Sequence, residues 1–392
     1  MADKIEKNNY NWNGSPLIHE PRSESQYSKP VSIDLFCGPG GISHGLRNAG
    51  FEPVLGVDIH EPSIDTYMEN HEDAYTVLGN VKKINGDCDV ESILDIIEID
   101  DYGQNSVLRK LIDRIGVNNL DLLTGGIPCQ GFSIANKKRD DEDERNYLFE
   151  EFIRCVKITD PEYVLIENVS TMQSAKDGEF VEDIEKCLRK LDYTVDHKVL
   201  KATEFGVPQS RERLFFLASK NQDDILWPNT SVAKNDFVTV NEAISDLPSL
   251  NAGESTNSYQ QDPENAYQRQ MRDKKHGLSN HKAPNHRKKT VERIRNTVQG
   301  EPMYDRFRQR VRLDPNEPSP TIIAGGIRPQ FQFGHPVEDR GLTVRERARI
   351  QSFPDDYVFE GGLTQSRVQT GMAVPPMLAE KLGEKILEML DE

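Results

Sequence analysis

Short apolar runs alternate with amphipathic segments between residues 31 and 219. Four of the runs have the length and the Val, Ile and Leu content of buried strands. They lie at 31–36, 52–59, 121–127 and 163–169. Segments with helical spacing of apolar residues follow them at 42–50, up to Tyr67, and at 148–158. This alternation predicts an α/β fold with a doubly wound, mostly parallel sheet.

The pattern changes after residue 220. Residues 221–312 are rich in Asn, Gln, Arg and Lys, and few of their apolar runs are long enough for central strands, so we expect a second, smaller, loop-rich domain. Helical amphipathicity returns at 342–353 and 375–390, which indicates a return to the first domain. The predicted organisation is a disordered leader, a catalytic and cofactor-binding domain, the loop-rich domain and the returning segment, at 1–29, 30–220, 221–335 and 336–392 respectively.

Composition narrows the class of protein. The 392 residues hold five cysteines without a CxxC pair, which favours neither a disulfide framework nor a zinc ribbon and indicates a reducing, intracellular compartment. No segment provides the roughly 18 uncharged apolar residues of a membrane helix, and the amino terminus lacks the apolar core of a signal peptide. His276, His281 and His286 lack acidic or thiol companions at ligand spacing, so we expect no metal site. We therefore expect a soluble, cytoplasmic protein.

Charge is distributed unevenly. The net charge is −17, yet residues 265–313 hold nine Arg and five Lys against four acidic residues, a local charge of +10. A basic stretch of this density is typical of phosphate contacts with nucleic acid. A solvated basic face is the alternative that charge alone leaves open.

The first strand leads into the sequence DLFCGPGGIS, which is typical of a ligand-binding turn. Asp34 lies in the strand, and Gly38, Gly40 and Gly41 allow the backbone to approach a ligand at the start of a helix. The second strand ends at Asp58, about twenty residues further on, where a carboxylate can hold a ribose diol. Because the spacing departs from GxGxxG, an adenosine-containing ligand with one ribose is favoured over a dinucleotide.

A second candidate site follows the strand at 121–127. The sequence TGGIPCQGFS places Cys129 on the loop that leaves the carboxyl end of this strand, where open α/β sheets carry their chemistry. A buried structural thiol is the competing interpretation, since a free cysteine behaves as a small hydrophobe. The other four cysteines are expected to be structural.

Five motifs in fixed order resemble those of the cytosine carbon-5 DNA methyltransferases. They are DLFCGPGG, GGIPCQGFS, ENV, QSRER and RLDPNEPSPTI. The resemblance runs from about Val31 to the carboxyl terminus, and only residues 221–312 fall outside the common motifs. It implies a Rossmann-like methyltransferase domain, a target-recognition domain at 221–335, and a sequence-specific enzyme that acts on duplex DNA.

The resemblance implies S-adenosyl-L-methionine as the methyl donor. The positions that match the cofactor pocket, with Asp58 on the ribose and Ile59 on the adenine, are Asp34, Phe36, Gly38, Gly40, Gly41, Asp58, Ile59, Asn80, Pro128, Met372 and Val374. Two of them depart from the family. Asn80 replaces the usual aspartate that reads the adenine amino group, although its carbonyl can accept the same hydrogen bond. Met372 stands where an asparagine is usual, which removes a polar contact.

The resemblance also implies the catalytic residues. Cys129 adds to carbon 6 of cytosine, Glu167 in a neutral form relieves charge at nitrogen 3, and Arg213 holds the exocyclic oxygen. Arg211 matches a supporting residue near the phosphates, and Gln130 and Ser133 match the segment that closes over DNA. Because the target atom is stacked inside the duplex, the base must be flipped out.

Two alternatives to a sequence-specific DNA methyltransferase stay open. One branch of the family acts on tRNA, and the departures at Asn80 and Met372 fit a degenerate DNA-binding homologue without activity. The +10 segment favours duplex DNA over tRNA. We expect a monomer that associates with the nucleoid when bound to DNA, and a cognate restriction endonuclease is a candidate partner.

Overall fold

The computed structural model describes residues 14–23, 27–85, 93–99, 101–128, 148–272, 277–324 and 331–391. The chain divides into two compact units. The first comprises residues 1–200, 212–228 and 379–392, and the second comprises residues 201–211 and 229–378. No helix among the described residues is long and apolar enough to cross a bilayer.

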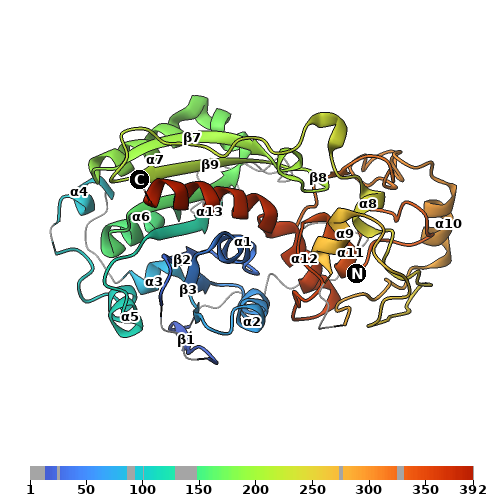
Figure 1. Ribbon diagram of the computed structural model, residues 1–392, viewed down its shortest axis with the longest axis horizontal. Helices are drawn as coiled ribbons and strands as arrows, with labels where there is room; N and C mark the ends of the chain where they lie inside the picture. Colours follow the sequence, from blue (N-terminus) through green and yellow to red (C-terminus); the bar gives the residue numbers. More distant parts are fainter. Residues whose placement is uncertain are drawn as a thin grey trace, which may run out of the picture. The chain divides into compact units, whose positions relative to one another are not determined.

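The first unit is built on an eight-stranded sheet with the order β1-β4-β3-β2-β5-β6-β9-β7. Figure 1 labels β1, β2, β3, β7 and β9 of this sheet. Its strands are β1 (Leu17–His19), β2 (Val31–Leu35), β3 (Glu52–Asp58), β4 (Tyr75–Leu78), β5 (Leu122–Gly126), β6 (Tyr163–Val169), β7 (Thr194–Lys201) and β9 (Glu212–Ser219). The pairs from β4 through β3, β2 and β5 to β6 are parallel, whereas β1 and β9 join antiparallel. The predicted mostly parallel α/β sheet is therefore confirmed.

The helices of the first unit connect these strands. They are α1 (Gly41–Ala49), α2 (Glu61–Asn70), α3 (Val81–Ile84), α4 (Ile93–Ile97), α5 (Val107–Ile115), α6 (Leu148–Thr159), the 3₁₀ helix η2 (Ser170–Gly178), α7 (Glu179–Lys190) and α13 (Pro376–Leu390), which crosses the unit boundary. The strand order runs outward from β2 through β3 and β4 in one direction and through β5 and β6 in the other. Because crossovers between parallel strands are right-handed, helices before and after this reversal cover opposite faces of the sheet.

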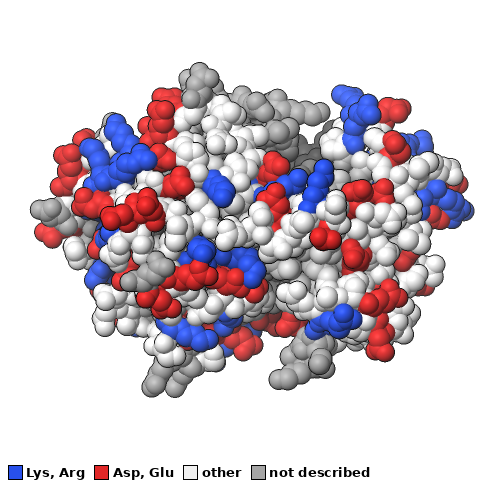
Figure 2. Space-filling model, turned by 45° about the horizontal axis from the view of Figure 1, so that its top comes forward, with Lys and Arg blue, Asp and Glu red and all other residues white. Residues whose placement is uncertain are grey.

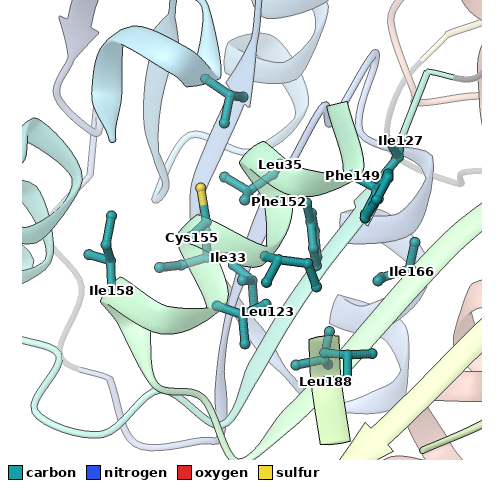
Figure 3. Packing of buried hydrophobic residues seen from close by; sticks show 14 of the residues in the cluster. Ile33, Leu35, Leu123, Ile127, Phe149, Phe152, Cys155, Ile158, Ile166 and Leu188 are labelled. Atoms are coloured by element: carbon teal, nitrogen blue, oxygen red, sulfur yellow. The ribbon is translucent and has the colours of Figure 1, made fainter. Parts of the chain in front are cut away.

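The core of the first unit lies between the sheet and α6. Ile33 and Leu123 on the strands and Phe152 and Cys155 on α6 are completely buried (Figure 3). The strands read as near-continuous apolar runs because both faces are covered. This packing fixes the carboxyl ends of β2 and β5 next to each other, with Leu35 paired to Gly125.

The amino-terminal segment differs in part from the expected disordered leader. Leu17–His19 form β1, which pairs antiparallel with β4 through Leu17 and Leu78 and through His19 and Thr76. An exposed sheet edge offers unpaired backbone groups, and a segment of three residues can satisfy them although its apolar side chains, Leu17 and Ile18, stay exposed. Residues 1–13 and 24–26 lie outside the described part of the chain.

The second unit has little regular structure. It contains the parallel pair β8 (Gln209–Ser210) and β10 (Ser319–Pro320), the helices α8 (Val240–Ile244), α9 (Ala266–Met271), α10 (Lys288–Asn296), α11 (Val344–Ile350) and α12 (Leu363–Met372), and the 3₁₀ turns η3 (Ala202–Phe205) and η4 (Lys234–Asp236). Residues 336–378 belong to this unit, whereas the sequence pattern predicts that they return to the first domain. The reason is packing, since Leu342 and Ile350 join the cluster of Val240 and Ile244. A target-recognition role for 221–335 stays a prediction.

The amphipathic pattern predicted for 342–353 is wrong for α11, because all seven of its residues are buried. Arg345 donates to the carbonyl oxygens of Ser279 and Tyr357 at 3.0 and 2.6 Å. Arg349 binds both carboxylate oxygens of Asp355 at 2.6 Å and Asp246 at 3.1 Å. Arginines can be buried in this way only when their donors are satisfied.

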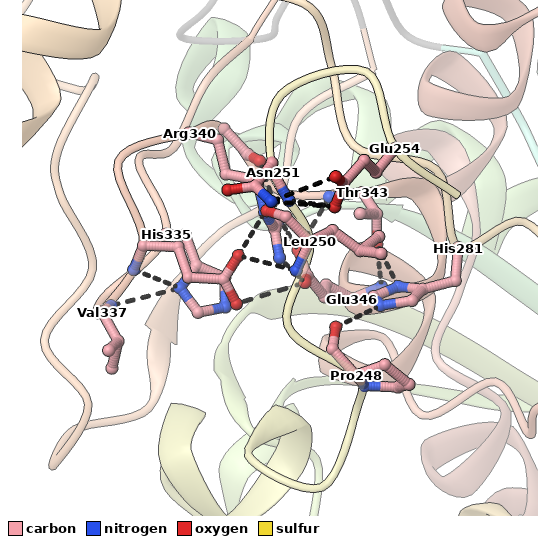
Figure 4. Close-up of polar contacts among 12 residues, drawn as sticks. Pro248, Leu250, Asn251, Glu254, His281, His335, Val337, Arg340, Thr343 and Glu346 are labelled. Atoms are coloured by element: carbon pink, nitrogen blue, oxygen red, sulfur yellow. Dashed lines mark hydrogen bonds and ion pairs between the residues drawn. The ribbon is translucent and has the colours of Figure 1, made fainter. Parts of the chain in front are cut away.

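The start of α11 is held by a second buried ion pair (Figure 4). Arg340 donates to the two carboxylate oxygens of Glu346 at 2.9 and 2.7 Å, and Thr343 and Glu346 form a capping box. Burial raises the pKa of Glu346, but Arg340 outweighs it and holds the pKa well below its usual range. His335 Nε2 lies 3.7 Å from Glu346 Oε1, and His335 is also buried.

Arg349→Met tests how strongly the second unit depends on these pairs. Removal of the guanidinium leaves Asp246 and Asp355 buried without their partner, so we expect a loss of about 3–5 kcal/mol in the free energy of unfolding. Arg295→Met is the matched control, because Arg295 pairs with Asp339 on the surface, where solvent screens the pair, so its loss should change the free energy of unfolding far less. Urea unfolding monitored by circular dichroism measures both, and equal losses would contradict the assignment.

Candidate functional site

The site lies at the strand reversal of the first unit. In open α/β sheets, the loops that leave the carboxyl ends of the two strands at such a reversal diverge and open a ligand crevice. The two strands are β2, which ends at Leu35, and β5, which ends at Gly126. Both candidate sites predicted from the sequence follow these strands.

Asp34 is the buried polar centre of the β2 end. Its side chain is 1% exposed, and Oδ2 accepts a hydrogen bond from Ser43 Oγ at 2.7 Å. Tyr67 in turn donates to Ser43 Oγ at 2.9 Å. The other oxygen, Oδ1, has no hydrogen-bond partner within the described ranges. Burial is the main reason why the pKa of Asp34 is raised to about 7.

The turn from β2 into α1 has an unusual backbone. Phe36, Gly38 and Gly40 adopt φ values of 54°, 54° and 89°, and α1 begins at Gly41. Glycine adopts this left-handed region at low cost, whereas for Phe36 it is a strained conformation of the kind that occurs at ligand sites. The turn brings the backbone N–H of Gly38 against the next strand.

Asp58 at the end of β3 receives that N–H group. Its Oδ2 accepts from the Gly38 nitrogen at 2.8 Å and its Oδ1 from the His60 nitrogen at 2.7 Å. Burial raises the pKa of Asp58, and the two backbone hydrogen bonds oppose that rise. Each carboxylate oxygen retains capacity for one further donor, so the carboxylate is oriented to accept hydrogen bonds from a diol. Ile59 beside it is half-buried, as a residue in contact with a flat ring would be.

Asn80 has a structural function in the free protein. Its side-chain oxygen accepts from the Lys82 nitrogen at 3.0 Å and thereby caps α3. The same oxygen was predicted to accept from the adenine amino group. An amide oxygen has two lone pairs, so the cap and the cofactor contact are compatible.

The β5 and β6 ends hold a charged pair. Glu167 in β6 lies opposite Gly126 in β5, and its Oε1 forms an ion pair with Arg213 Nε in β9 at 2.8 Å. A Cβ atom on Gly126 would lie 3.2 Å from Glu167 Oε2, so a glycine leaves room for the carboxylate. Burial lowers the pKa of Arg213, and Glu167 opposes this shift. The guanidinium thus lies against the carboxylate, and proton donation by Glu167, in a neutral or transiently protonated form, stays a prediction.

The loop after β5 is described only as far as Pro128, which is half-buried. Asn168 donates to the Ile127 carbonyl at 3.2 Å and ties this loop to β6. Cys129, Gln130 and Ser133 lie outside the described residues, so their predicted roles stay predictions.

The remaining predicted site residues belong to the second unit. Arg211 is 2% exposed and donates to the carbonyl oxygens of Ile322 at 3.1 Å and Gly371 at 3.4 Å. In the free protein its guanidinium thus joins two segments that are distant in the sequence, and its predicted role near the phosphates stays a prediction. Met372 is 38% exposed at the end of α12, and Val374 is buried.

Sequence reasoning missed Ser43 and Tyr67, which orient Asp34. Ser43 carried a weak signal, because it is a polar residue two positions after Gly41 on a helix face that is otherwise buried. Tyr67 carried none, since it was interpreted as an apolar residue that ends a helical pattern. Within the described ranges, no group of three His, Cys, Asp or Glu side chains could hold a metal ion.

A glycine-rich turn and an oriented carboxylate at the strand reversal define an α/β protein that binds a nucleoside-containing cofactor. Comparison with known proteins identifies the particular kind. The chain belongs to the C-5 cytosine-specific DNA methylases, whose family model matches residues 31–388. Members of this family use S-adenosyl-L-methionine as the methyl donor, so the protein is a DNA (cytosine-5-)-methyltransferase with this cofactor.

Individual relatives agree with the family. The type II methyltransferase M1.HphI of Haemophilus parahaemolyticus is 35% identical, over 91% of this chain and 86% of the relative. The type II methyltransferase M.DdeI of Desulfomicrobium norvegicum is 33% identical, over 90% of this chain and 88% of the relative. A solved structure described as a DNA modification methyltransferase encoded within a prophage (E. coli) has a TM-score of 0.72 at 26% identity, over 93% of this chain and 100% of that chain.

The residues at the β2 and β3 ends fit the cofactor. Asp58 is oriented for a ribose diol, and Asp34 holds an unpartnered buried oxygen. When bound, S-adenosyl-L-methionine supplies an electrophilic methyl group. The carboxylate oxygens of Asp58 would supply hydrogen-bond acceptors that orient its ribose.

Asp34→Asn tests the buried proton at this site. Between about pH 4 and the folded-state pKa of about 7, the folded protein keeps the Asp34 proton and the unfolded chain releases it. The unfolded chain then binds fewer protons, so stability falls as the pH rises through this window. We expect the melting temperature of the wild type to fall more steeply from pH 5 to pH 7.5 than that of the variant. Parallel profiles would show that Asp34 is ionised in the folded protein.

Proposed function

We propose that the protein methylates carbon 5 of cytosine within a defined sequence of duplex DNA, by base flipping and a covalent adduct between Cys129 and carbon 6. The observation that carries this proposal is the ion pair between Glu167 and Arg213 beside Gly126. It joins a carboxylate that can exchange a proton and a guanidinium that can bind an oxygen, next to the strand that leads to Cys129.

Carbon 5 of cytosine is a poor nucleophile, and the Cys129 thiolate raises its reactivity. The Cys129 thiolate adds to carbon 6, and the electron pair of the double bond moves to carbon 5, which can then accept the methyl group. Loss of the carbon 5 proton and cleavage of the carbon–sulfur bond restore the double bond and release the thiolate. The thiolate is the reactive form, so the surroundings of Cys129 must favour its ionisation.

Glu167 and Arg213 act on the same edge of the ring in this proposal. The exocyclic oxygen of the flipped cytosine accepts from Arg213, which draws the guanidinium away from Glu167. With that charge compensation reduced, Glu167 can hold a proton and share it with nitrogen 3 as negative charge develops there. The ion pair of the free protein is thus the resting arrangement, and substrate binding changes it.

The proposal extends to the partner, the oligomeric state and the location of the enzyme. The named relatives are type II methyltransferases, and we propose that this enzyme likewise protects sites against a cognate restriction endonuclease. It acts as a monomer, since one chain provides both the cofactor site and the candidate DNA-binding segment. We propose the cytoplasm as its location, with association to the nucleoid through bound DNA.

Two competing functions are separated by one assay. Labelled S-adenosyl-L-methionine is incubated with the protein and either genomic DNA or tRNA. Label in DNA supports the proposal, label in tRNA supports the RNA branch, and label in neither supports a non-catalytic homologue. The hydrogen bond from the Gly38 nitrogen to Asp58 orients the Asp58 carboxylate toward the proposed cofactor site, and this speaks against a degenerate site.

Cys129→Ser tests the covalent step. We expect methyl transfer to fall by at least about 1,000-fold while DNA binding is retained, because only the nucleophile is lost. Cys187→Ala is the control, since Cys187 is buried in α7 away from the proposed chemistry. A duplex with 5-fluorocytosine should trap the wild type as a covalent adduct on Cys129. An adduct on another cysteine would refute the mechanism.

The basic segment 265–313 separates into two groups in the structure. Arg272 and Arg295 are ion-paired to Asp246 and Asp339, and Arg312 binds backbone carbonyls. The exposed residues without an ion pair within the described ranges are Arg269, Lys282, Arg287, Lys288, Lys289, Arg306 and Arg308. Figure 2 shows basic and acidic side chains interspersed over one face, so the negative net charge does not exclude local phosphate contacts.

The start of α10 is the strongest candidate for such contacts. Arg287 precedes the helix, and Lys288 and Lys289 occupy its first turn. Positive charge is unfavourable there because the N–H groups of the first turn already carry partial positive charge. An unfavourable arrangement of this kind is relieved when a phosphate binds.

The double variant Lys288→Ala/Lys289→Ala tests these contacts. We expect weaker binding to all DNA sequences and a salt dependence that is flatter by roughly one unit of slope per lost phosphate contact. Lys381→Ala/Lys385→Ala is the matched control, because these lysines of α13 are paired with Glu384 and Glu388. Fluorescence anisotropy at several salt concentrations provides the slopes. An unchanged slope would remove the start of α10 from the DNA interface.

A further inference from the structure

Residues 300–312 of the second unit form a hairpin, which we term the arginine hairpin. Gly300 donates to the Arg312 carbonyl at 2.7 Å and Met303 to the Arg310 carbonyl at 2.8 Å. Pro302 and Val311 form an antiparallel bridge between these bonds. Arg310 donates to the Phe307 carbonyl at 2.9 Å and closes the tip. The backbone of the hairpin is therefore defined by its own hydrogen bonds.

The base of the hairpin is fastened to the rest of the second unit. The guanidinium of Arg312 donates to the carbonyl oxygens of Ile294 at 3.1 Å and Thr297 at 3.2 Å, at the end of α10. Met303 is buried in a cluster with Ile294. An arginine that binds the last carbonyls of a helix stabilises its carboxyl end. The base of the hairpin is therefore held to α10 by hydrogen bonds and apolar contacts.

Arginines of α10 and of the tip lie against the aromatic rings of the tip. Carbon ζ of Arg293 lies 4.2 Å from the ring centre of Tyr304. Arg310 lies 4.6 Å from Phe307 and 5.5 Å from Tyr304, and Arg306 lies 5.9 Å from Phe307. None of these arginines has an ion-pair partner in the part of the chain that the structure describes. Such an excess of positive charge is typical of a surface that binds an electron-rich partner.

Arg310 stands out among them. Its side chain is 3% exposed, yet Nε and Nη1 find no acceptor among the described residues. Buried donors are nearly always satisfied, because an unmade hydrogen bond is costly. The two rings in contact with Arg310, those of Tyr304 and Phe307, belong to its own hairpin and offer no hydrogen-bond acceptor in the plane of the guanidinium. The side chain is built to meet an acceptor that the free protein does not supply.

We propose that Arg310 reads a guanine in the recognised DNA sequence by donating to its O6 and N7 atoms in the major groove. This inference rests on the proposed function as a sequence-specific DNA methyltransferase. A guanidinium that donates to both atoms fixes the identity of the base, and guanine is the base that presents two adjacent acceptors there. Contact with two rings fixes the plane of the Arg310 guanidinium, which a base pair requires and a phosphate does not.

Arg308 provides the contrast within the same hairpin. It is exposed and has no ion pair within the described ranges, so nothing fixes the direction of its guanidinium. We assign it to the phosphate backbone, which gives affinity without sequence information. The two arginines, two positions apart, are therefore expected to respond differently to the same substitution.

The experiment compares Arg310→Met with Arg308→Met on a duplex library of random sequence. The wild type and both variants methylate the library in vitro, and bisulfite sequencing gives the motif of each. For Arg310→Met we expect the wild-type motif with discrimination at one G·C position reduced by about 5- to 150-fold. For Arg308→Met we expect an unchanged motif and lower methylation of all sequences.

The outcomes separate the possible explanations. Uniform loss with Arg310→Met would make Arg310 a phosphate contact, and an unchanged motif and rate would make it a packing residue; either result overturns the inference. If Arg310→Met fails to fold, Arg310→Lys decides, because it keeps the charge and stem but lacks the planar pair of donors. A wild type that methylates no DNA motif would remove the proposed function itself, whereas a defined wild-type motif leaves that function intact.

Discussion

The reversal of strand order between β2 and β5 is the constraint on which the cofactor site depends. Right-handed crossovers require the helices on either side of the reversal to cover opposite faces. The loops after these two strands therefore diverge, and the buried ends of both strands face the space between them. Asp34, the turn at Gly38 and the paired Gly126 and Glu167 all lie at this edge because the topology leaves no other place for them.

The second unit is stabilised in a different way from the first. It has short helices and few strands. Buried arginines add to its apolar clusters, since each guanidinium carries five donors in a rigid plane and can join several loops at once. Arg345 ties α11 to Ser279 and Tyr357, and Arg349 ties it to Asp246 and Asp355. The loops of this unit are held by hydrogen bonds of defined direction.

The sheet could be predicted from the sequence because strands buried on both faces have a clear apolar signature. The strand at Tyr163–Val169 was predicted to the residue. The second unit could not be predicted in the same way. The arginines of α11 have the sequence pattern of an exposed face, and only their partners, distant in the chain, explain why they are buried. The pairing of β1 likewise depends on an edge of β4 that no local pattern reveals.

The candidate site shows the same division. Motif order identified Glu167 and Arg213, and their ion pair follows from the antiparallel register of β6 and β9. The cap that Asn80 provides for α3 and the buried contacts of Arg211 depend on neighbouring backbone groups, which residue type alone does not specify. Their contacts were therefore outside the reach of sequence reasoning.

The way in which Arg312 fastens the arginine hairpin also bears on how the protein can change over generations. All its acceptors are main-chain carbonyl oxygens, at residues 294, 295, 297, 335 and 337. Carbonyls are present whatever side chain a position carries. Substitutions at the tip and along α10 can accumulate while the attachment persists, so the hairpin is a place where new target preferences can arise by drift without loss of the scaffold.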